Sequence, residues 1–240
     1  MKIIINGACG QMGQALSAAI AKSGDEIAAA VDKYAENAPY KELSEYEGEA
    51  DVIVDFSHHS AAEALCAYAV RRKLPLVIAT TGHTDEELAR IHEAAKSVPV
   101  FLSANMSLGV ALLIELAKKT VSVFPDADIE IVETHHRRKL DAPSGTAKMI
   151  VEGIREVRPE KKAHCGRAGM EKREKDEIGV QSVRMGNIVG IHEVHVCTDN
   201  QVLTLRHEAQ SRALFADGAL SAAKFLVGKV PGVYAMKDLV

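Results

Sequence analysis

The chain has 240 residues, of which 47% are hydrophobic and 26% charged, and its formal net charge is -4. This composition is typical of a globular protein, and the lack of a basic excess argues against nucleic-acid binding because few cations are available to neutralise phosphates. No apolar run approaches the roughly 20 residues that a membrane-spanning helix needs. The four cysteines show no CxxC spacing, and a predicted strand begins at once, so we expect no signal peptide and a cytoplasmic enzyme.

The first 32 residues have the pattern of a dinucleotide-binding unit. An apolar strand is predicted at 2–6, a glycine loop follows at 7–13, a helix at 14–24, and a second strand at 26–32 ends in Asp32. The glycines allow the main chain to approach a pyrophosphate, and Asp32 is placed to bind a ribose hydroxyl. Asp32 repels a 2′-phosphate, whereas Lys33 can pair with it. The two adjacent residues together therefore predict that both NADH and NADPH are accepted. The loop reads GxxGxxG rather than GxGxxG, and such a loop is a weak signal alone.

The alternation of strands and helices continues to about residue 104. Strands are predicted at 51–57, 75–81 and 99–104, with helices at 60–73 and 84–97, the second of which opens with the capping box of Thr84 and Glu87. Ligands of an open parallel sheet gather at the carboxyl ends of the strands. We therefore expect the segments 55–57, 80–82 and 104–106 to surround one crevice together with Asp32.

Residues 133–147 carry the densest set of chemically useful side chains. The segment contains two adjacent histidines, three cations and Pro143-Ser-Gly-Thr146, between an alternating strand at 128–133 and a helix that begins near Ala147. Ser144 is a predicted N-cap, and the first amides of a helix attract carboxylates. A histidine, a lysine and an anion cradle predict acid–base chemistry on a small acid. On composition alone, a solvated turn is an equally good interpretation.

The second half of the chain predicts a different architecture. After an apolar helix at 108–124, the charged segment 155–177 is predicted to be a solvated, mobile excursion, and three antiparallel strands are expected at 178–185, 188–197 and 202–210. A helix at 213–227 should return to the nucleotide-binding domain. Paired histidines such as His192 and His195 would face opposite sides of a strand, so we expect no metal site.

These elements predict an α/β fold in two domains. The first is a Rossmann-type parallel-sheet domain formed by residues 1–106 and 213–240, which should bind the dinucleotide. The second is an α+β domain, residues 107–212, for substrate binding and oligomerisation.

The sequence resembles the 4-hydroxy-tetrahydrodipicolinate reductase (dihydrodipicolinate reductase) family almost from end to end. The most specific element is HHRRKLDAPSGTA at 135–147, supported by the segments at 55–57, 80–82, 105–109, 184–186 and 215–218. The resemblance implies reduction of a small cyclic dicarboxylate to tetrahydrodipicolinate by NADH or NADPH, in lysine biosynthesis through diaminopimelate. It also implies a homotetramer joined through strands of the second domain.

The resemblance also assigns roles to individual residues. His135 would donate or accept the proton and Lys139 would be a second proton donor, while His136 and the amides of Gly145 and Thr146 would bind the dicarboxylate. Two positions depart from the family pattern, since Ala79 replaces a frequent glycine and Met106 a common aromatic residue, which puts the fine cofactor preference in doubt. The implied cofactor contacts are Gly7, Ala8, Cys9, Gly10, Gln11 and Met12 at the pyrophosphate, Asp32 and Lys33 at the adenosine ribose, and Ala79, Thr80, Thr81, Ser103, Ala104, Asn105 and Met106 at the nicotinamide.

Two other classes of protein remain open at this point. A redox-sensing regulator would bind the cofactor without turning it over, but it leaves the histidines and lysine of 133–147 unexplained. A dehydrogenase of an acyclic amino acid or semialdehyde is the second alternative. A semialdehyde enzyme that forms a thioester needs a nucleophilic cysteine, and none lies within 133–147.

Overall fold

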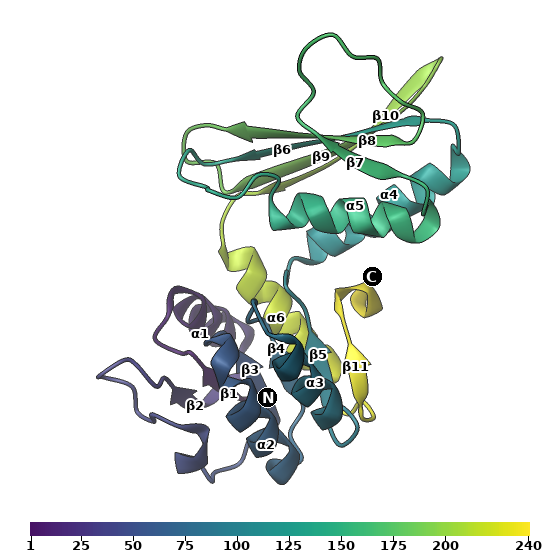
Figure 1. Cartoon of the computed structure of the whole chain (residues 1–240). Coiled ribbons are helices and arrows are strands. Elements are labelled where there is room, and N and C mark those ends of the chain that lie inside the picture. The colour runs from purple at the N-terminus through teal and green to yellow at the C-terminus, as the bar shows by residue number, and fades with distance from the viewer. The chain divides into compact units, whose positions relative to one another are not determined.

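The computed structural model describes residues 1–240 and separates into two compact units (Figure 1). Unit 1 comprises Met1–Ser107 and Arg212–Leu239, and unit 2 comprises Leu108–Ser211 together with Val240. Each unit has its own sheet and its own helices. No helix combines the length and the apolar character that crossing a bilayer requires.

Unit 1 is built on a six-stranded sheet with the strand order β11-β5-β4-β3-β1-β2, in which every pairing is parallel. The central strands β3 and β4 are buried along their whole length and are apolar except for Asp55 at the end of β3, which is typical of parallel sheets. This confirms the predicted Rossmann-type sheet. The strand bounds are β1 Lys2–Asn6, β2 Glu26–Val31, β3 Val52–Asp55, β4 Leu76–Ile78, β5 Pro99–Leu102 and β11 Gly232–Tyr234.

Helices cover both faces of this sheet. The helices α1 (Gln11–Ser23) and α6 (Ala213–Leu226) contact each other, and α6 also packs on β3, β4 and β5. The predicted return of the last helix to the nucleotide-binding part is thus confirmed. The helices α2 (Ala62–Arg72) and α3 (Asp85–Ala94) share the other hydrophobic core, and the capping box of Thr84 and Glu87 is present. Short 3-10 helices span Leu43–Glu45, His59–Ala61 and Met236–Leu239.

Unit 2 is a five-stranded mixed sheet with the order β10-β9-β6-β8-β7. The helices α4 (Leu108–Val123) and α5 (Gly145–Val157) contact each other and, as Figure 1 shows, lie on one face of this sheet. Residues of β6 alternate between buried and partly exposed, so its buried side faces the core that these helices close. The strand bounds are β6 Asp128–His135, β7 Lys162–Cys165, β8 Glu177–Arg184, β9 Gly190–Thr198 and β10 Gln201–Ala209.

The expected run of three antiparallel strands is wrong in one respect. Strands β9 and β10 form an antiparallel hairpin, but β6 lies between β8 and β9, parallel to the first and antiparallel to the second. The turn at Gly186 exists, with a φ of 52°, but it connects strands that are not neighbours. A turn signal is local and cannot reveal that a distant apolar strand inserts between the two strands that it joins.

The charged segment 155–177 was predicted to be a solvated excursion, and most of residues 162–176 are indeed exposed, but part of the segment forms regular structure. It contributes β7 to the edge of the sheet, and Arg173 pairs with Asp128 and Glu130 of β6. Lys161 is only 2% exposed, with its ammonium group donating to the main-chain oxygen of Lys175 over 2.7 Å. Hydrogen bonds and ion pairs with distant residues therefore attach this segment to the sheet, although its composition is typical of a solvated loop.

Replacing Gly13 with alanine tests the close packing of the glycine loop. A Cβ at Gly13 would lie 2.2 Å from the main-chain oxygen of Gly7 and 2.6 Å from that of Ala8, so the loop would have to shift. We expect Gly13→Ala to lower the free energy of unfolding by about 1–3 kcal/mol, the usual cost of overpacking. Chemical denaturation followed by circular dichroism measures the change.

The matched control for this prediction is Gly10→Ala in the same loop. A Cβ at Gly10 would meet its nearest atom at 3.5 Å, and the φ of -69° suits alanine. Its free energy of unfolding should stay close to that of the wild type. Equal destabilisation by both substitutions would contradict the packing argument.

Candidate functional site

The loop after β1 has the geometry of a phosphate-binding turn. Gly7 has a φ of 80°, a conformation that glycine adopts without strain, and Gly10 is the N-cap of α1. The carboxylate of Asp32 accepts hydrogen bonds from the main-chain nitrogens of Cys9 at 3.0 Å and of Tyr34 and Ala35 at 3.1 Å. Asp32 therefore fixes the loop and still has acceptor capacity for a ribose hydroxyl.

A cavity of about 620 Å³ in unit 1 opens beside this loop. Four of the predicted cofactor residues line it, namely Gly7, Gly10, Asp32 and Lys33. The other predicted cofactor residues do not line this cavity. Ser57, from the segment 55–57 that was expected at this crevice, also lines the cavity. The sequence interpretation missed two further cations in its wall, Lys41 and Arg71, and the polar residues Asn6, Ser44, His58 and Ser60. A glycine-rich helix start, an acid and several cations around one cavity fit a dinucleotide.

A buried carboxylate connects the strand ends at which the nicotinamide is predicted to bind in unit 1. Asp55, at the end of β3, is 1% exposed and accepts hydrogen bonds from Asn6 at 2.8 Å, Ser57 at 2.6 Å and Thr80 at 2.6 Å. Burial raises its pKa, while these donors act in the opposite direction. The hydroxyl of Thr80 thus holds the ends of β3 and β4 in register.

The remaining predicted nicotinamide residues form a compact turn after β5. The hydroxyl of Ser103 donates to the main-chain oxygen of Asn105 over 2.8 Å, and the side chain of Asn105 accepts from the nitrogen of Ser107 over 2.9 Å. Met106 is 2% exposed, whereas Ala104 is exposed. Ala79 is partly exposed and Thr81 fully exposed at the neighbouring strand end.

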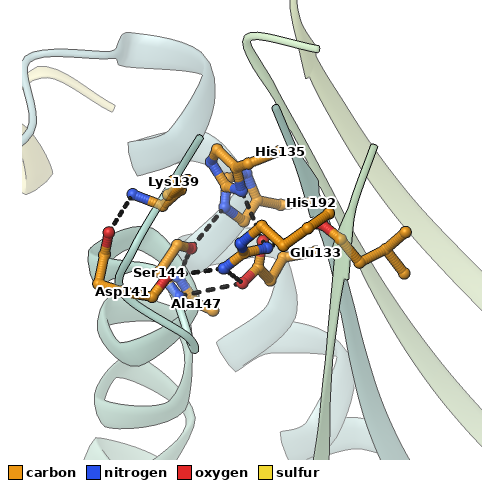
Figure 2. Close-up of polar contacts among 9 residues, drawn as sticks. Glu133, His135, Lys139, Asp141, Ser144, Ala147 and His192 are labelled. Atoms are coloured by element: carbon orange, nitrogen blue, oxygen red, sulfur yellow. Dashed lines mark hydrogen bonds and ion pairs between the residues drawn. The ribbon is translucent and has the colours of Figure 1, made fainter. Parts of the chain in front are cut away.

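In unit 2, the side chain of His135 is held by a carboxylate of its own strand. Glu133 and His135 are two residues apart on β6, so both face the core. The imidazole Nδ1 of His135 lies 2.5 Å from Glu133 Oε2 (Figure 2). Arg184, at the end of β8, binds both oxygens of Glu133 at 2.8 Å. This bidentate pair is a strong, geometrically specific interaction.

The start of α5 is joined to the same cluster. Ser144 caps the helix by accepting a hydrogen bond from the nitrogen of Ala147 over 3.2 Å, which confirms the predicted cap. The nitrogen of Ser144 donates to Glu133 Oε1 over 3.1 Å, and its hydroxyl lies 3.1 Å from His192 Nε2. A Cβ at Gly145 would meet no atom within 4 Å, so space is open in front of the first turn.

Lys139 and His136 complete the set that was predicted in this loop. The ammonium group of Lys139 lies 2.8 Å from Asp141, and its side chain is 21% exposed (Figure 2). His136 Nδ1 is buried without a hydrogen-bond partner. The loop thus presents a cation and an imidazole nitrogen that can pair with an anion.

Burial controls the protonation of the two histidines that face each other in this cluster. The rings of His135 and His192 are 5.1 Å apart, and each is less than 9% exposed. Burial lowers the pKa of His135, although the Glu133 carboxylate raises it. Burial, with a further contribution from His135, lowers the pKa of His192 to about 4. His192 is therefore neutral near pH 7.

Four residues of the cluster were not predicted to belong to the site: Glu133, Ser144, Arg184 and His192. A signal for Glu133 existed, because it lies two positions before His135 on a strand and must share its face. Ser144 was recognised only as a cap. Arg184 and His192 lie about 50 residues away in the sequence, and only the pairing of β6 with β8 and β9 brings them to the site.

Comparison with known proteins identifies the family. The family model described as "Dihydrodipicolinate reductase, N-terminus" matches residues 1–106, and the model described as "Dihydrodipicolinate reductase, C-terminus" matches residues 109–240. The 4-hydroxy-tetrahydrodipicolinate reductase of Caldanaerobacter subterraneus subsp. tengcongensis is 49% identical over 247 residues, covering 100% of this chain and 98% of the relative. The enzyme of the same name from Alkaliphilus oremlandii is 49% identical over 191 residues, covering 79% of each chain.

A solved structure supports the fold. The dipicolinate-bound dihydrodipicolinate reductase from Paenisporosarcina sp. TG-14 superimposes with a TM-score of 0.81 at 24% identity, covering 100% of this chain and 99% of that chain. The resemblance drawn from the sequence is confirmed, and the regulator and the acyclic dehydrogenase are set aside. This chain belongs to the dihydrodipicolinate reductase family and is an NAD(P)H-dependent oxidoreductase of that family.

Proposed function

We propose that this protein reduces 4-hydroxy-tetrahydrodipicolinate to tetrahydrodipicolinate in lysine biosynthesis through diaminopimelate, and that residues 133–147 form its substrate site. One hydride from NADH or NADPH and one proton enter, and water and the oxidised cofactor leave. The observation that carries the assignment of the site is the convergence of a buried histidine, a lysine and an open helix start within one loop.

The substrate carboxylates are assigned to the start of α5. The helix dipole and the main-chain amides of its first turn favour a carboxylate, and the open space at Gly145 leaves room for one beside Thr146. The imidazole of His136 has a buried nitrogen without a partner in the protein, which supports a contact with the same dicarboxylate. These groups would orient the ring and draw electron density as the charge develops.

His135 and Lys139 are the proposed proton carriers. A bound reduced nicotinamide would supply a hydride, a hydrogen with its two electrons, and the substrate would then need one proton, which residues of this chain can deliver. In neutral His135, the hydrogen on Nδ1 is directed to Glu133, so Nε2 is the nitrogen that exchanges a proton. Lys139 supplies a second acidic hydrogen and a positive charge beside the substrate.

The cofactor is assigned to unit 1. The glycine loop would hold the pyrophosphate, and Asp32 and Lys33 the adenosine ribose with or without a 2′-phosphate. The cavity beside these residues, with Lys41 and Arg71 in its wall, supports this assignment. The nicotinamide is assigned to the strand ends at 79–81 and the turn at 103–106.

The two units would then be the two functional domains of a cytoplasmic homotetramer. Unit 1 would bind the dinucleotide, and unit 2 would bind the substrate and form the contacts between subunits. Strand β10 is a nine-residue edge strand, and Val202 is 59% exposed on it. An edge of this length normally needs a cover, which supports assembly through this sheet. Analytical ultracentrifugation measures the assembly directly.

The reaction is tested by a coupled assay. Pyruvate and aspartate semialdehyde are condensed by the preceding synthase, and the oxidation of NADH or NADPH is followed by absorbance. We expect a loss of the reduced cofactor that depends on both proteins, with each cofactor accepted. Binding of the cofactor without its oxidation would refute the proposed reaction.

Lys139→Ala tests the second proton donor. Because positioned acids contribute about 10²–10⁴-fold to a rate, kcat should fall by about a hundredfold or more under saturating substrate. The matched control is Lys148→Ala, which removes an exposed lysine from the first turns of α5. Normal turnover of the Lys139 variant would show that this lysine is not a proton carrier.

The burial of His192 predicts a loss of stability in mild acid. Its pKa is about 4 in the folded protein and about 6.5 in an unfolded chain, so the unfolded state binds more protons between these values. The contribution of neutral His192 is complete above pH 6.5 and is lost as the pH falls towards 4, by up to about 3 kcal/mol. Denaturant unfolding at a series of pH values measures this slope.

His192→Gln should flatten the slope of unfolding free energy against pH between 6.5 and 4. Burial also lowers the pKa values of His135 and His207, so part of the slope should remain. The control is His195→Gln, on the same strand but the opposite face, which should leave the slope unchanged. An unchanged slope in the His192 variant would disprove the prediction.

A further inference from the structure

The carboxylate of Glu133 is fully buried and receives hydrogen bonds from Arg184, from His135 and from the main chain at Ser144. Its Oε1 accepts from Arg184 Nη2 at 2.8 Å and from the nitrogen of Ser144 at 3.1 Å. Its Oε2 accepts from Arg184 Nη1 at 2.8 Å and lies 2.5 Å from His135 Nδ1 (Figure 2). An ionised carboxylate can only accept, so the hydrogen between Glu133 and His135 belongs to Nδ1.

We propose that Glu133, held by Arg184, is the positioning residue of this site: one carboxylate keeps the hydrogen of His135 on Nδ1 and anchors the main chain at Ser144 beside the substrate-binding amides. The proposal rests on the function proposed above, since it assigns His135 and the start of α5 to the reaction. Glu133 acts through His135 and Ser144 and is not itself a proton carrier.

Arg184 keeps the carboxylate charged despite its burial. Burial alone raises the pKa of Glu133, but the hydrogen bonds from Arg184 and His135 outweigh this and hold the pKa at about 2. The guanidinium group is itself fixed, because it donates to the main-chain oxygens of Val183 at 2.8 Å and Asp141 at 2.7 Å. The carboxylate is therefore a permanent anion of fixed orientation at neutral pH.

The charge of Glu133 counteracts the groups that lower the pKa of His135. Burial and the charges of Lys139 and Arg184 lower the pKa of His135, and His192 packs its neutral ring against the imidazole. Glu133 raises the pKa of His135 through its hydrogen bond and its charge. Without this carboxylate, the imidazolium that donates the proton would form only at lower pH.

The same carboxylate links the proton carrier to the anion cradle. Ser144 binds Glu133 through its nitrogen and caps α5 through its hydroxyl, which also contacts His192. Arg184 holds the loop at a second point, the oxygen of Asp141. The helix start and the imidazole are therefore fixed relative to a common group, as the alignment of a substrate with its proton donor requires.

Glu133→Gln is the decisive substitution because it preserves size and removes the charge. A glutamine amide has one acceptor oxygen and one donor nitrogen, so it cannot accept from donors on both sides. With His135 donating as imidazolium, activity is lost as the pH rises through its pKa, and removal of the anion lowers that pKa. We expect the alkaline limb of the plot of kcat against pH to shift to lower pH by about one pH unit or more. At pH 7.5, kcat should fall by about tenfold or more. The Kd for NADPH should not change.

Glu130→Gln is the matched control. Glu130 lies on the same strand, on the opposite face, and forms an ion pair with Arg173. Its substitution removes an equal charge and should leave the alkaline limb in place. A Glu133 variant with an unshifted limb, whatever its kcat, would overturn the proposal, because a purely structural role lowers activity without moving the titration.

The tautomer of His135 provides a test that needs no folded variant at Glu133. The ring nitrogens of ¹⁵N-histidine-labelled wild-type protein are recorded near pH 8, and His135 is assigned by the signal that His135→Gln removes. We expect Nδ1 to carry the hydrogen and Nε2 to be bare. A hydrogen on Nε2 in the wild type would overturn the proposal. Wild-type protein that fails to oxidise NADPH in the coupled assay refutes the proposed function instead, whichever tautomer is found.

Discussion

The structure of unit 2 depends on one buried ionic contact, the pair formed by Glu133 and Arg184. A carboxylate without any exposed surface is unfavourable unless it is fully paired, and here both of its oxygens are occupied by charged or main-chain donors. The pair brings the end of β6 to the end of β8 and to the loop before α5. Removing Arg184 would leave the buried carboxylate of Glu133 without its charged partner, whereas the partly exposed guanidinium group of Arg184 could still be solvated if Glu133 were removed.

Unit 1 also has a buried carboxylate at the end of a strand, Asp55. Asp55 is buried at the end of β3 and holds Asn6 and Thr80 from the two neighbouring strands, without a cation nearby among its hydrogen-bond donors. In both units, a carboxylate at the end of a strand collects donors from adjacent strands and shapes the loops that follow. This arrangement explains why the chemically important segments begin where strands end, at 55–57 and 80–82 in unit 1 and at 135–147 in unit 2.

Burial accounts for the neutral histidine, His192, beside the proposed proton carrier His135. His192 cannot become charged near pH 7 because it is buried, so the wall that it forms next to His135 stays uncharged. The charge in this cluster is therefore concentrated on the pairs Glu133–Arg184 and Lys139–Asp141. Protonation of His135 would change this charge by one unit, which fits its proposed role as a proton carrier.

Much of the fold and part of the site were accessible from the sequence because their signals are local. The apolar runs of β1 to β5, the glycine loop, the capping box at Thr84 and the cap at Ser144 each depend on neighbouring residues. The ion pairs of Arg173, within the run of charged residues at 171–176, could not be foreseen for the opposite reason, since its partners Asp128 and Glu130 lie more than 40 residues earlier in the chain. The short strand β11 has only three residues and so offers no periodicity to recognise.

The sequence by itself determined the family, the strand–helix alternation of the first half and the loop that carries His135, Lys139 and Ser144. Only the tertiary structure decided the order of the strands in the second sheet and therefore the partners of Glu133. Arg184 and His192 reach the site because β6 inserts between β8 and β9. In this position β6 pairs along both of its edges, and such pairing between distant segments is a property of the packed sheet and not of any local stretch of residues.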